Sequence, residues 1–212
     1  MAEAAKMYEN VQRDILIALA NEYSEYCRLE SISISDVTDC ASTKWNFSKV
    51  NPGLVGGHYI SIDPYYLMDR CRKKQFKIPL ISQARITNEL KPSSVSKRII
   101  ELTNSIHEKN GSIRLLLLGF TYKADCSDIR NTKVADVIYE LKKVFDHVDC
   151  FDPFADKQDA KQIYNINLLD DIPALEEYDL VIRMVDHQAF NKIYNSSALN
   201  KSTYLLSLNE LL

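Results

Sequence analysis

The sequence predicts an α/β protein: an all-helical half, residues 1–110, followed by a doubly wound, Rossmann-like parallel-sheet domain, residues 111–212. In the first half, apolar residues recur at intervals of three and four, which is typical of amphipathic helices. From Ser112 onward, short apolar runs alternate with helical patterns, which is typical of a parallel sheet covered by helices. No strand pairing is therefore expected within the first hundred residues.

Composition excludes several classes of function. The chain has 212 residues, 46% of them hydrophobic, and a net charge of −3, which indicates a real core and gives no sign of nucleic acid or a membrane surface as partner. No apolar run is long enough to span a membrane, and the N-terminus is too polar for a signal peptide. The five cysteines are scattered and never form C-x-x-C, which predicts reduced thiols in a cytoplasmic protein, with no disulfide framework and no metal site.

The first helix is expected over residues 3–29, a run without Gly or Pro. Its apolar stripe consists of Val11, Ile15, Ala18, Leu19 and Tyr23. Lys6, Asn10 and Arg13 are spaced three or four apart and share another face. Periodicity alone favours an ordinary solvated face for these residues.

The rest of the first half is predicted as four further helices. They begin at Ser35 and at Asp63-Pro64, with Ser35 and Asp63 as caps, and cover residues 78–90 and 93–109. The last two are separated because Pro92 lacks a backbone N–H and should stop a helix. The fourth is expected to end at Asn110-Gly111.

The second half contains four predicted strands. They lie at residues 114–119, 147–151, 179–185 and 202–206, with helices expected at 132–145, 155–163, near 173–176 and at 187–194. In sheets of this kind, ligands bind beyond the carboxyl ends of the strands.

A glycine loop, residues 51–62, lies between the helices of the first half. It holds three of the five glycines, Gly53, Gly56 and Gly57. Glycine is used where the backbone takes a positive φ or approaches another group closely. The loop leads into a helix N-terminus, whose N–H groups suit an anion, so it is a candidate binding loop; the alternative is a tight interdomain turn.

A second candidate site follows the first strand. This segment has no G-x-G-x-x-G, so a self-contained dinucleotide site is not expected there. Lys123, Arg130 and Lys133 instead bring cations suited to phosphates to the carboxyl end of the strand. Without further information, these cations are equally surface residues.

The sequence of the glycine loop resembles that of the UDP-glucose/GDP-mannose dehydrogenase family, in the branch that oxidises UDP-N-acetylhexosamines to uronic acids for polysaccharide biosynthesis. The loop of that branch reads P-G-L-V-G-G-H-C-I-x-V-D-P-Y-Y-L. This chain matches it from Pro52 to His58 and from Asp63 to Leu67. It departs at one decisive position, since Tyr59 stands where the family has its nucleophilic cysteine.

The resemblance implies a set of site residues in the first half. The segment from Glu3 to Arg13 is similar to the family's central helix, where the matching Lys6 and Asn10 point into the active site. A lysine ammonium there can stabilise an oxyanion, and an asparagine can hold that oxygen or a water. The implied catalytic residues are Lys6, Asn10, Tyr59 and Asp63, and the implied substrate contacts are Arg13, Gly53, Gly56, Gly57, His58 and Arg85. Arg85 is equally explained as helix surface.

In the second half, the segment after Gly119 is similar to the family's G-x-x-F-K-x-x-x-x-D-x-R pattern. The resemblance implies that Lys123 contacts the nucleotide sugar and that Arg130 lies near the cofactor pyrophosphate. His187 is expected to be a nucleotide-pocket or structural residue. Cys126 does not occupy the nucleophile position and is interpreted as a packing or incidental thiol.

The implied chemistry is a double oxidation of the sugar 6-hydroxyl with NAD. The cysteine thiolate captures the intermediate aldehyde, a second oxidation gives a thioester, and water releases the uronate. A phenol, which ionises only near pH 10 in peptides, is a poor substitute.

These residues correspond to the central and C-terminal domains of a family member, and most of the NAD site is expected on an N-terminal domain outside them. The chain by itself is therefore expected to be inactive. A homodimer through the first helix is expected, because family central helices pack against a partner chain. The alternative is a non-catalytic nucleotide-sugar-binding or dimerisation module.

Overall fold

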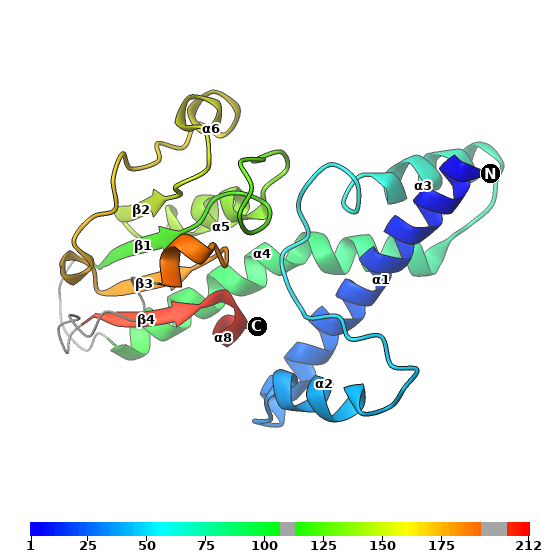
Figure 1. Cartoon of the computed structure of the whole chain (residues 1–212), viewed down its shortest axis with the longest axis horizontal. Coiled ribbons are helices and arrows are strands. Elements are labelled where there is room, and N and C mark those ends of the chain that lie inside the picture. The colour runs from blue at the N-terminus through cyan, green and yellow to red at the C-terminus, as the bar shows by residue number, and fades with distance from the viewer. Residues whose placement is uncertain (107–112, 192–202) are drawn as a thin grey trace. The chain divides into compact units, whose positions relative to one another are not determined.

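The computed structural model describes residues 1–106, 113–191 and 203–212 (Figure 1). It divides into two compact units, Met1–Lys91 with Leu212, and Pro92–Leu211. The first unit is helical and the second is α/β. Each unit is described by itself.

The helical unit is built around one long helix. This helix, α1, covers Ala2–Leu29 and contacts both α2, Ile34–Ser42, and α3, Asp63–Lys73. The unit also contains the first part of α4, Pro79–Ile106. No strand occurs among residues 1–106, all of which the structure describes, so the predicted all-helical first half is confirmed.

Two helix starts differ from the prediction by one or two residues. The cap of α2 is Ser33, whose side chain accepts a hydrogen bond from the Asp36 N–H at 3.2 Å, and Ser35 is already helical. Asp63 is the first residue of α3 and not its cap. The Asp63 N–H already donates to the Tyr59 carbonyl at 2.8 Å, so the turn before α3 draws Asp63 into the helix.

The predicted break at Pro92 is wrong, because α4 runs through it without interruption. A proline removes one backbone hydrogen bond from a helix, but tertiary packing can hold the helix together. Here Pro92 is buried, Val95 and Ile99 after it are fully buried, and the Ser96 hydroxyl donates to the Pro92 carbonyl at 2.8 Å. The division of the chain into the two units falls between Lys91 and Pro92, whereas a boundary was expected near residue 110. The expected end at Asn110-Gly111 lies outside the described residues.

The α/β unit contains one four-stranded parallel sheet with the order β2-β1-β3-β4 (Figure 1). The strands are β1, Arg114–Leu118; β2, His147–Phe151; β3, Leu180–Arg183; and β4, Tyr204–Ser207. All pairs are parallel, as predicted. Leu116 pairs with Asp149 on one side and with Val181 on the other, which makes β1 a central strand.

After α4, the described helices of this unit lie near the predicted ones, except that the first ends at Leu141 instead of residue 145 and that a short helix at Leu208–Leu211 was not predicted. They are α5, Lys133–Leu141; α6, Lys157–Tyr164; η1, Leu175–Glu177; η2, Gln188–Phe190; and α8, Leu208–Leu211. Side-chain caps define two starts, since Thr132 accepts from the Val134 N–H at 3.3 Å and Asp156 from the Asp159 N–H at 2.9 Å. Of the helix expected at 187–194, residues 192–194 lie outside the described residues.

The core of the α/β unit lies on both sides of β1. On one face, Leu116 and Leu118 pack with Val181, with Leu175 of η1 and Tyr178 directly after it, and with Phe190 of η2. Leu115 and Leu117 point to the opposite face and are fully buried, because side chains alternate along a strand. A strand buried on both faces reads as a continuous apolar run, which is why it could be predicted. In the part of the chain that the structure describes, no helix is long and apolar enough to cross a membrane.

Candidate functional site

The glycine loop is tied to α1 near its beginning and at its end. Asn21 holds Gly53 with both atoms of its amide: Oδ1 accepts the Gly53 N–H at 2.9 Å, and Nδ2 donates to the Gly53 carbonyl at 3.0 Å. At the other end, Asn10 Nδ2 donates to Asp63 Oδ2 at 2.6 Å. Asn10 and Asn21 are eleven residues apart, about 16 Å along a helix. This helix therefore fixes both ends of the loop.

A buried polar network lies behind Asn21. Asn21 Nδ2 also donates to Asn88 Oδ1 at 2.9 Å, and Asn88 Nδ2 donates to Asp14 Oδ1 at 2.8 Å. Asp14 in turn forms an ion pair with Arg85, which also pairs with Glu89 on α4. The loop is thus connected to a buried charge pair through two asparagines.

The Arg85–Asp14 pair serves geometry more than stability. Burial lowers the pKa of Arg85, but the Asp14 carboxylate, a hydrogen bond with Tyr65 and the Glu89 carboxylate together raise it by more, so the guanidinium stays charged. Burial raises the pKa of Asp14 even beside Arg85, which indicates that desolvation outweighs the ion pair. The guanidinium also lies 5.6 Å from the centre of the Tyr65 ring. In this structure Arg85 is buried and engaged by protein groups; its contact with substrate stays a prediction.

Tyr59 lies at a tight turn in the middle of the loop. Its carbonyl accepts the N–H groups of Ile62 at 3.0 Å and of Asp63 at 2.8 Å. Gly57 has a φ of +81°, a left-handed conformation that favours glycine. The Tyr59 side chain is 55% exposed, and its ring lies 4.1 Å from the His58 ring, centre to centre. The turn therefore presents the phenol at the surface of the helical unit.

The polar residues predicted on α1 divide between two environments. Asn10 is buried, whereas Lys6 and Arg13 are exposed and both pair with Glu9, at 2.7 Å and 3.2 Å. The buried residues of α1 include polar as well as apolar side chains, since Asp14, Asn21 and Ser24 are also buried. The predicted apolar stripe is only partly buried: Leu19 is 59% and Tyr23 is 44% exposed.

In the α/β unit, Asp152 ties together the carboxyl ends of β1 and β2. Its Oδ2 accepts the N–H groups of Phe120 at 2.5 Å and Thr121 at 3.0 Å, and its Oδ1 accepts those of Phe154 at 2.7 Å and Ala155 at 3.0 Å. Burial raises the pKa of this carboxyl, but a hydrogen bond from His187 and those from the backbone lower it to about 2. Asp152 is therefore a fixed negative charge at this edge of the sheet.

The three cations predicted at this edge are placed differently. Lys123 is exposed, with its ammonium 5.6 Å from the centre of the Tyr122 ring. Arg130 is 61% exposed and forms a bidentate pair with Asp128, at 2.9 Å and 2.7 Å. Lys133 is buried and pairs with Asp136 at 3.3 Å. Lys123 and Arg130 are thus presented to solvent near the carboxyl end of β1.

Two domains of one protein family match the two halves of the chain. Residues 1–90 match the central domain of the UDP-glucose/GDP-mannose dehydrogenase family, and residues 116–206 match its UDP binding domain. This chain belongs to the UDP-glucose/GDP-mannose dehydrogenase family. The match confirms the resemblance seen in the glycine loop and in the segment after Gly119.

Relatives with known names agree with this assignment. The chain is 38% identical to UDP-N-acetyl-D-glucosamine 6-dehydrogenases of Salmonella typhi, over 91% of this chain and 45% of the relative, and of Pseudomonas aeruginosa, over 97% and 49%. Among solved structures, UDP-D-ManNAc dehydrogenase from Pyrococcus horikoshii is similar, with 26% identity and a TM-score of 0.82, over 97% of this chain and 47% of that chain. The chain spans about half the length of the dehydrogenases it matches.

Sequence reasoning missed three residues of the loop anchor, the buried polar network that holds the glycine loop. Asp14, Asn21 and Asn88 were not among the expected site residues, yet they connect Arg85 to Gly53. A signal was present, because buried polar residues at positions 10, 14, 21 and 24 recur at helical spacing along α1. Such a face predicts contacts with another polar element.

Proposed function

We propose that this chain provides the sugar-handling and UDP-binding parts of an NAD-dependent UDP-N-acetylhexosamine 6-dehydrogenase. The observation that supports this most directly is the pairing of Asn10 with Asp63, which brings two implied catalytic residues from α1 and the end of the glycine loop to 2.6 Å. The names of the relatives favour a UDP-N-acetylhexosamine as substrate.

Three residues of the helical unit have a chemical role in this proposal. The Asp63 carboxylate and the Asn10 amide orient the sugar's reacting oxygen or a water beside it. Lys6, one turn before Asn10, stabilises negative charge that develops on that oxygen. Lys6 is on the exposed surface and pairs with Glu9. Exposed pairs contribute only about 0–1 kcal/mol, so the ammonium can change partner at little cost.

The α/β unit is proposed to hold the UDP moiety at the carboxyl edge of its sheet. Ligands of parallel sheets bind there, and Lys123 presents an exposed ammonium suited to a phosphate. The Asp152 hydrogen bonds to Phe120 and Thr121 hold the segment that carries Lys123.

NAD, when bound, supplies the hydride acceptor. The residues of this chain fit only a peripheral contact with it, since G-x-G-x-x-G is absent and Arg130 is an exposed guanidinium already held by Asp128. We therefore place most of the NAD site on an additional domain. Arg130 would contribute by exchanging Asp128 for a pyrophosphate oxygen.

Tyr59 limits the chemistry that this site supports. A thiolate at its position would capture an aldehyde covalently, and that capture makes the second oxidation possible. The exposed Tyr59 side chain has no thiol and therefore cannot form the covalent thiohemiacetal or the thioester. The chain as it stands is proposed to bind nucleotide sugar without completing the double oxidation.

The experiment joins the NAD-binding domain of the Pseudomonas aeruginosa relative to this chain. NADH absorbance with UDP-N-acetylglucosamine is compared between the chimera with Tyr59 and the chimera with Tyr59→Cys. We expect two NADH per sugar from Tyr59→Cys and at most one from Tyr59. Two NADH per sugar with Tyr59 would overturn the assignment of this position, and Cys126→Ala would then identify the replacement nucleophile.

A second candidate function is a non-catalytic module that binds nucleotide sugar. The observation that favours it is again the exposed side chain of Tyr59, to which this proposal assigns the position of the family nucleophile. It predicts that the isolated chain binds UDP-N-acetylglucosamine in calorimetry, and that the Tyr59→Cys chimera binds it but produces no NADH. Turnover by that chimera would exclude this alternative.

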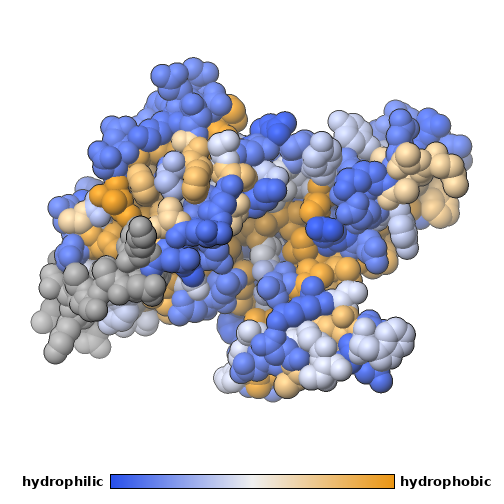
Figure 2. Space-filling model, in the orientation of Figure 1, coloured by the Kyte–Doolittle hydropathy of each residue, from blue (hydrophilic) through white to orange (hydrophobic). Residues whose placement is uncertain are grey.

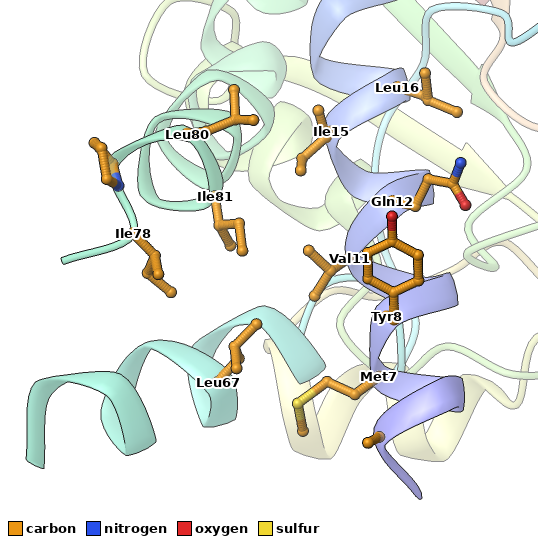
Figure 3. A pocket seen from close by; sticks show the side chains of 12 residues that line it. Met7, Tyr8, Val11, Gln12, Ile15, Leu16, Leu67, Ile78, Leu80 and Ile81 are labelled. Carbon is orange, nitrogen blue, oxygen red and sulfur yellow. The ribbon is translucent and has the colours of Figure 1, made fainter. Parts of the chain in front are cut away.

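We also propose that the helical unit forms a homodimer through α1. Exposed apolar side chains recur along this helix at Tyr8, Leu19, Tyr23, Tyr26 and Leu29, and Figure 2 shows hydrophobic residues at the surface over its middle. An apolar groove of about 600 Å³ adds to this face between α1, α3 and the start of α4; Met7, Val11, Leu67 and Ile81 line it (Figure 3). Apolar area in water is unfavourable by about 25 cal/mol per Å², which favours covering it with a second copy.

A further inference from the structure

The turn that carries Lys123 is held on both sides by one buried histidine. His187, just after β3, is fully buried between the rings of Phe154 and Phe190, with ring centres 4.9 Å and 5.3 Å away. Its Nδ1 accepts the Asp125 N–H at 2.9 Å. Its Nε2 lies 3.2 Å from the Thr121 hydroxyl and 3.0 Å from Asp152 Oδ2. Thr121 and Asp125 flank Lys123 by two residues on each side.

The contact with Asp125 is reciprocal. The Asp125 carboxylate accepts the N–H of Gln188, the residue after His187, at 3.0 Å. Asp125 itself has a φ of +53°, a left-handed conformation that is unfavourable for a residue with a side chain. Within the turn, the Thr121 hydroxyl donates to the Lys123 carbonyl at 2.9 Å. The hydrogen bond that His187 accepts from Asp125 and the one that Gln188 donates to it therefore hold the turn in a conformation that it would not favour alone.

These bonds fix the protonation pattern of the ring. Since Nδ1 accepts a backbone N–H, the ring proton is on Nε2, where it faces the Asp152 carboxylate. Asp152 also accepts the Phe120 and Thr121 N–H groups. The same carboxylate thus orients both the imidazole and the start of the turn.

We propose that His187 is a positioning residue for Lys123, acting through the Thr121–Asp125 turn with Asp152 holding its Nε2–H tautomer. The role of Lys123 as the UDP-phosphate contact rests on the proposed function, whereas the positioning of the turn by His187 does not. His187 itself makes no contact with a ligand in this proposal, because it is fully buried.

The first test needs no ligand. Heteronuclear NMR of the whole chain at pH 7 should show His187 with its proton on Nε2 and with Nδ1 as the acceptor. Hydrogen exchange of the Asp125 amide should be about tenfold faster in His187→Leu, the effect expected for one lost hydrogen bond. His187→Gln should restore the protection, because its amide can accept at one atom and donate at the other.

Two comparisons make this test specific. His147→Gln, at an exposed residue of β2, should leave the Asp125 amide unchanged. Exchange in α5 should be the same in all variants, which separates a local effect from global unfolding. A proton on Nδ1 in the unaltered chain would overturn the proposal even if His187→Leu failed to fold. Unchanged exchange at Asp125 in His187→Leu, or no rescue by His187→Gln, would also overturn it.

The second test uses UDP as the probe in a double-mutant cycle. His187→Leu should weaken UDP binding about tenfold in the unaltered chain, and by a much smaller factor when Lys123→Ala is present, since the two residues act through one contact. Equal effects in both backgrounds would show that His187 does not act through Lys123. No UDP binding by the unaltered chain would contradict the proposed function of the α/β unit, while the exchange and tautomer measurements would still decide the role of His187.

Discussion

Asn21 on α1 holds Gly53 of the glycine loop by two hydrogen bonds, one to the N–H at 2.9 Å and one from its own amide to the carbonyl at 3.0 Å. The two residues are 32 positions apart, so this contact belongs to the tertiary structure. Through Asn88, the same side chain is connected to the buried pair of Asp14 and Arg85. The loop thus has a rigid support on the helix that carries Asn10.

Replacing Asn21 should destabilise the helical unit strongly. Asn21→Ala leaves the Gly53 N–H, the Gly53 carbonyl and Asn88 Oδ1 without their partner, and we expect a loss of roughly 2–3 kcal/mol in the free energy of unfolding. Urea denaturation followed by circular dichroism measures it. Glu22→Gln, at the exposed neighbour on α1, is the control and should change stability by less than about 0.5 kcal/mol. A loss for Asn21→Ala as small as that of the control would show that the hydrogen bonds of Asn21 are unimportant for stability.

Replacement by alanine should reduce stability strongly at one glycine and only slightly at another. Gly119 has a φ of +99°, and a Cβ there would lie 2.5 Å from the Val185 Cβ, so Gly119→Ala should cost more than about 2 kcal/mol or prevent folding. Gly53 has open space around a Cβ, and Gly53→Ala should change stability by less than about 1 kcal/mol. Thermal unfolding of both variants tests this pair. The reverse order would contradict the backbone geometry described for Gly119.

Asp152 should make the α/β unit sensitive to acid. Its pKa is lowered from 3.8 to about 2, so its contribution is fully present above its unfolded value, near 4, and is lost as the pH falls through about 2. That difference corresponds to roughly 2 kcal/mol. Asp152→Asn should therefore be less stable than the unaltered chain at pH 7, with the gap narrowing toward pH 2. Chemical denaturation at several pH values measures the gap. Asp170→Asn, at an exposed carboxylate paired with Lys157, is the control and should change stability by less than about 1 kcal/mol.

The five thiols should differ in reactivity. Cys40 is exposed, whereas Cys27 and Cys150 are buried. Burial raises the pKa of Cys150 well above its usual value, and the nearby Asp152 carboxylate adds to this, so little thiolate forms. Iodoacetamide at pH 8 followed by peptide mass spectrometry should modify Cys40 first and Cys150 only on unfolding. Fast modification of Cys150 in the folded chain would contradict its placement in the sheet.

The proposed homodimer can be tested on α1. Leu19→Glu combined with Tyr23→Glu places charges in the exposed apolar stripe and should convert a dimer to a monomer in light scattering at micromolar concentration. Lys161→Glu on α6 is the control and should leave the mass unchanged. A monomeric mass for the unaltered chain would overturn the proposal.

Most of the secondary structure could be predicted because it follows local rules. The first helix was expected at residues 3–29 and is observed at Ala2–Leu29, since a long run without Gly or Pro and with helical spacing has few alternatives. The central strand β1 was recognised from its run of leucines, which is buried on both faces. Pro92 misled the prediction, because packing of Val95 and Ile99 holds α4 through the missing hydrogen bond.

The sequence by itself determined the fold class, the parallel sheet and the family. These features follow from local periodicity and from short motifs, so they can be predicted without knowing which distant residues are in contact. Only the tertiary structure decided which polar residues act together. The partners of Asn21, Asp14 and His187 lie dozens of residues away in the chain. A buried polar group must find a hydrogen-bond partner, but its own sequence neighbourhood does not say which one.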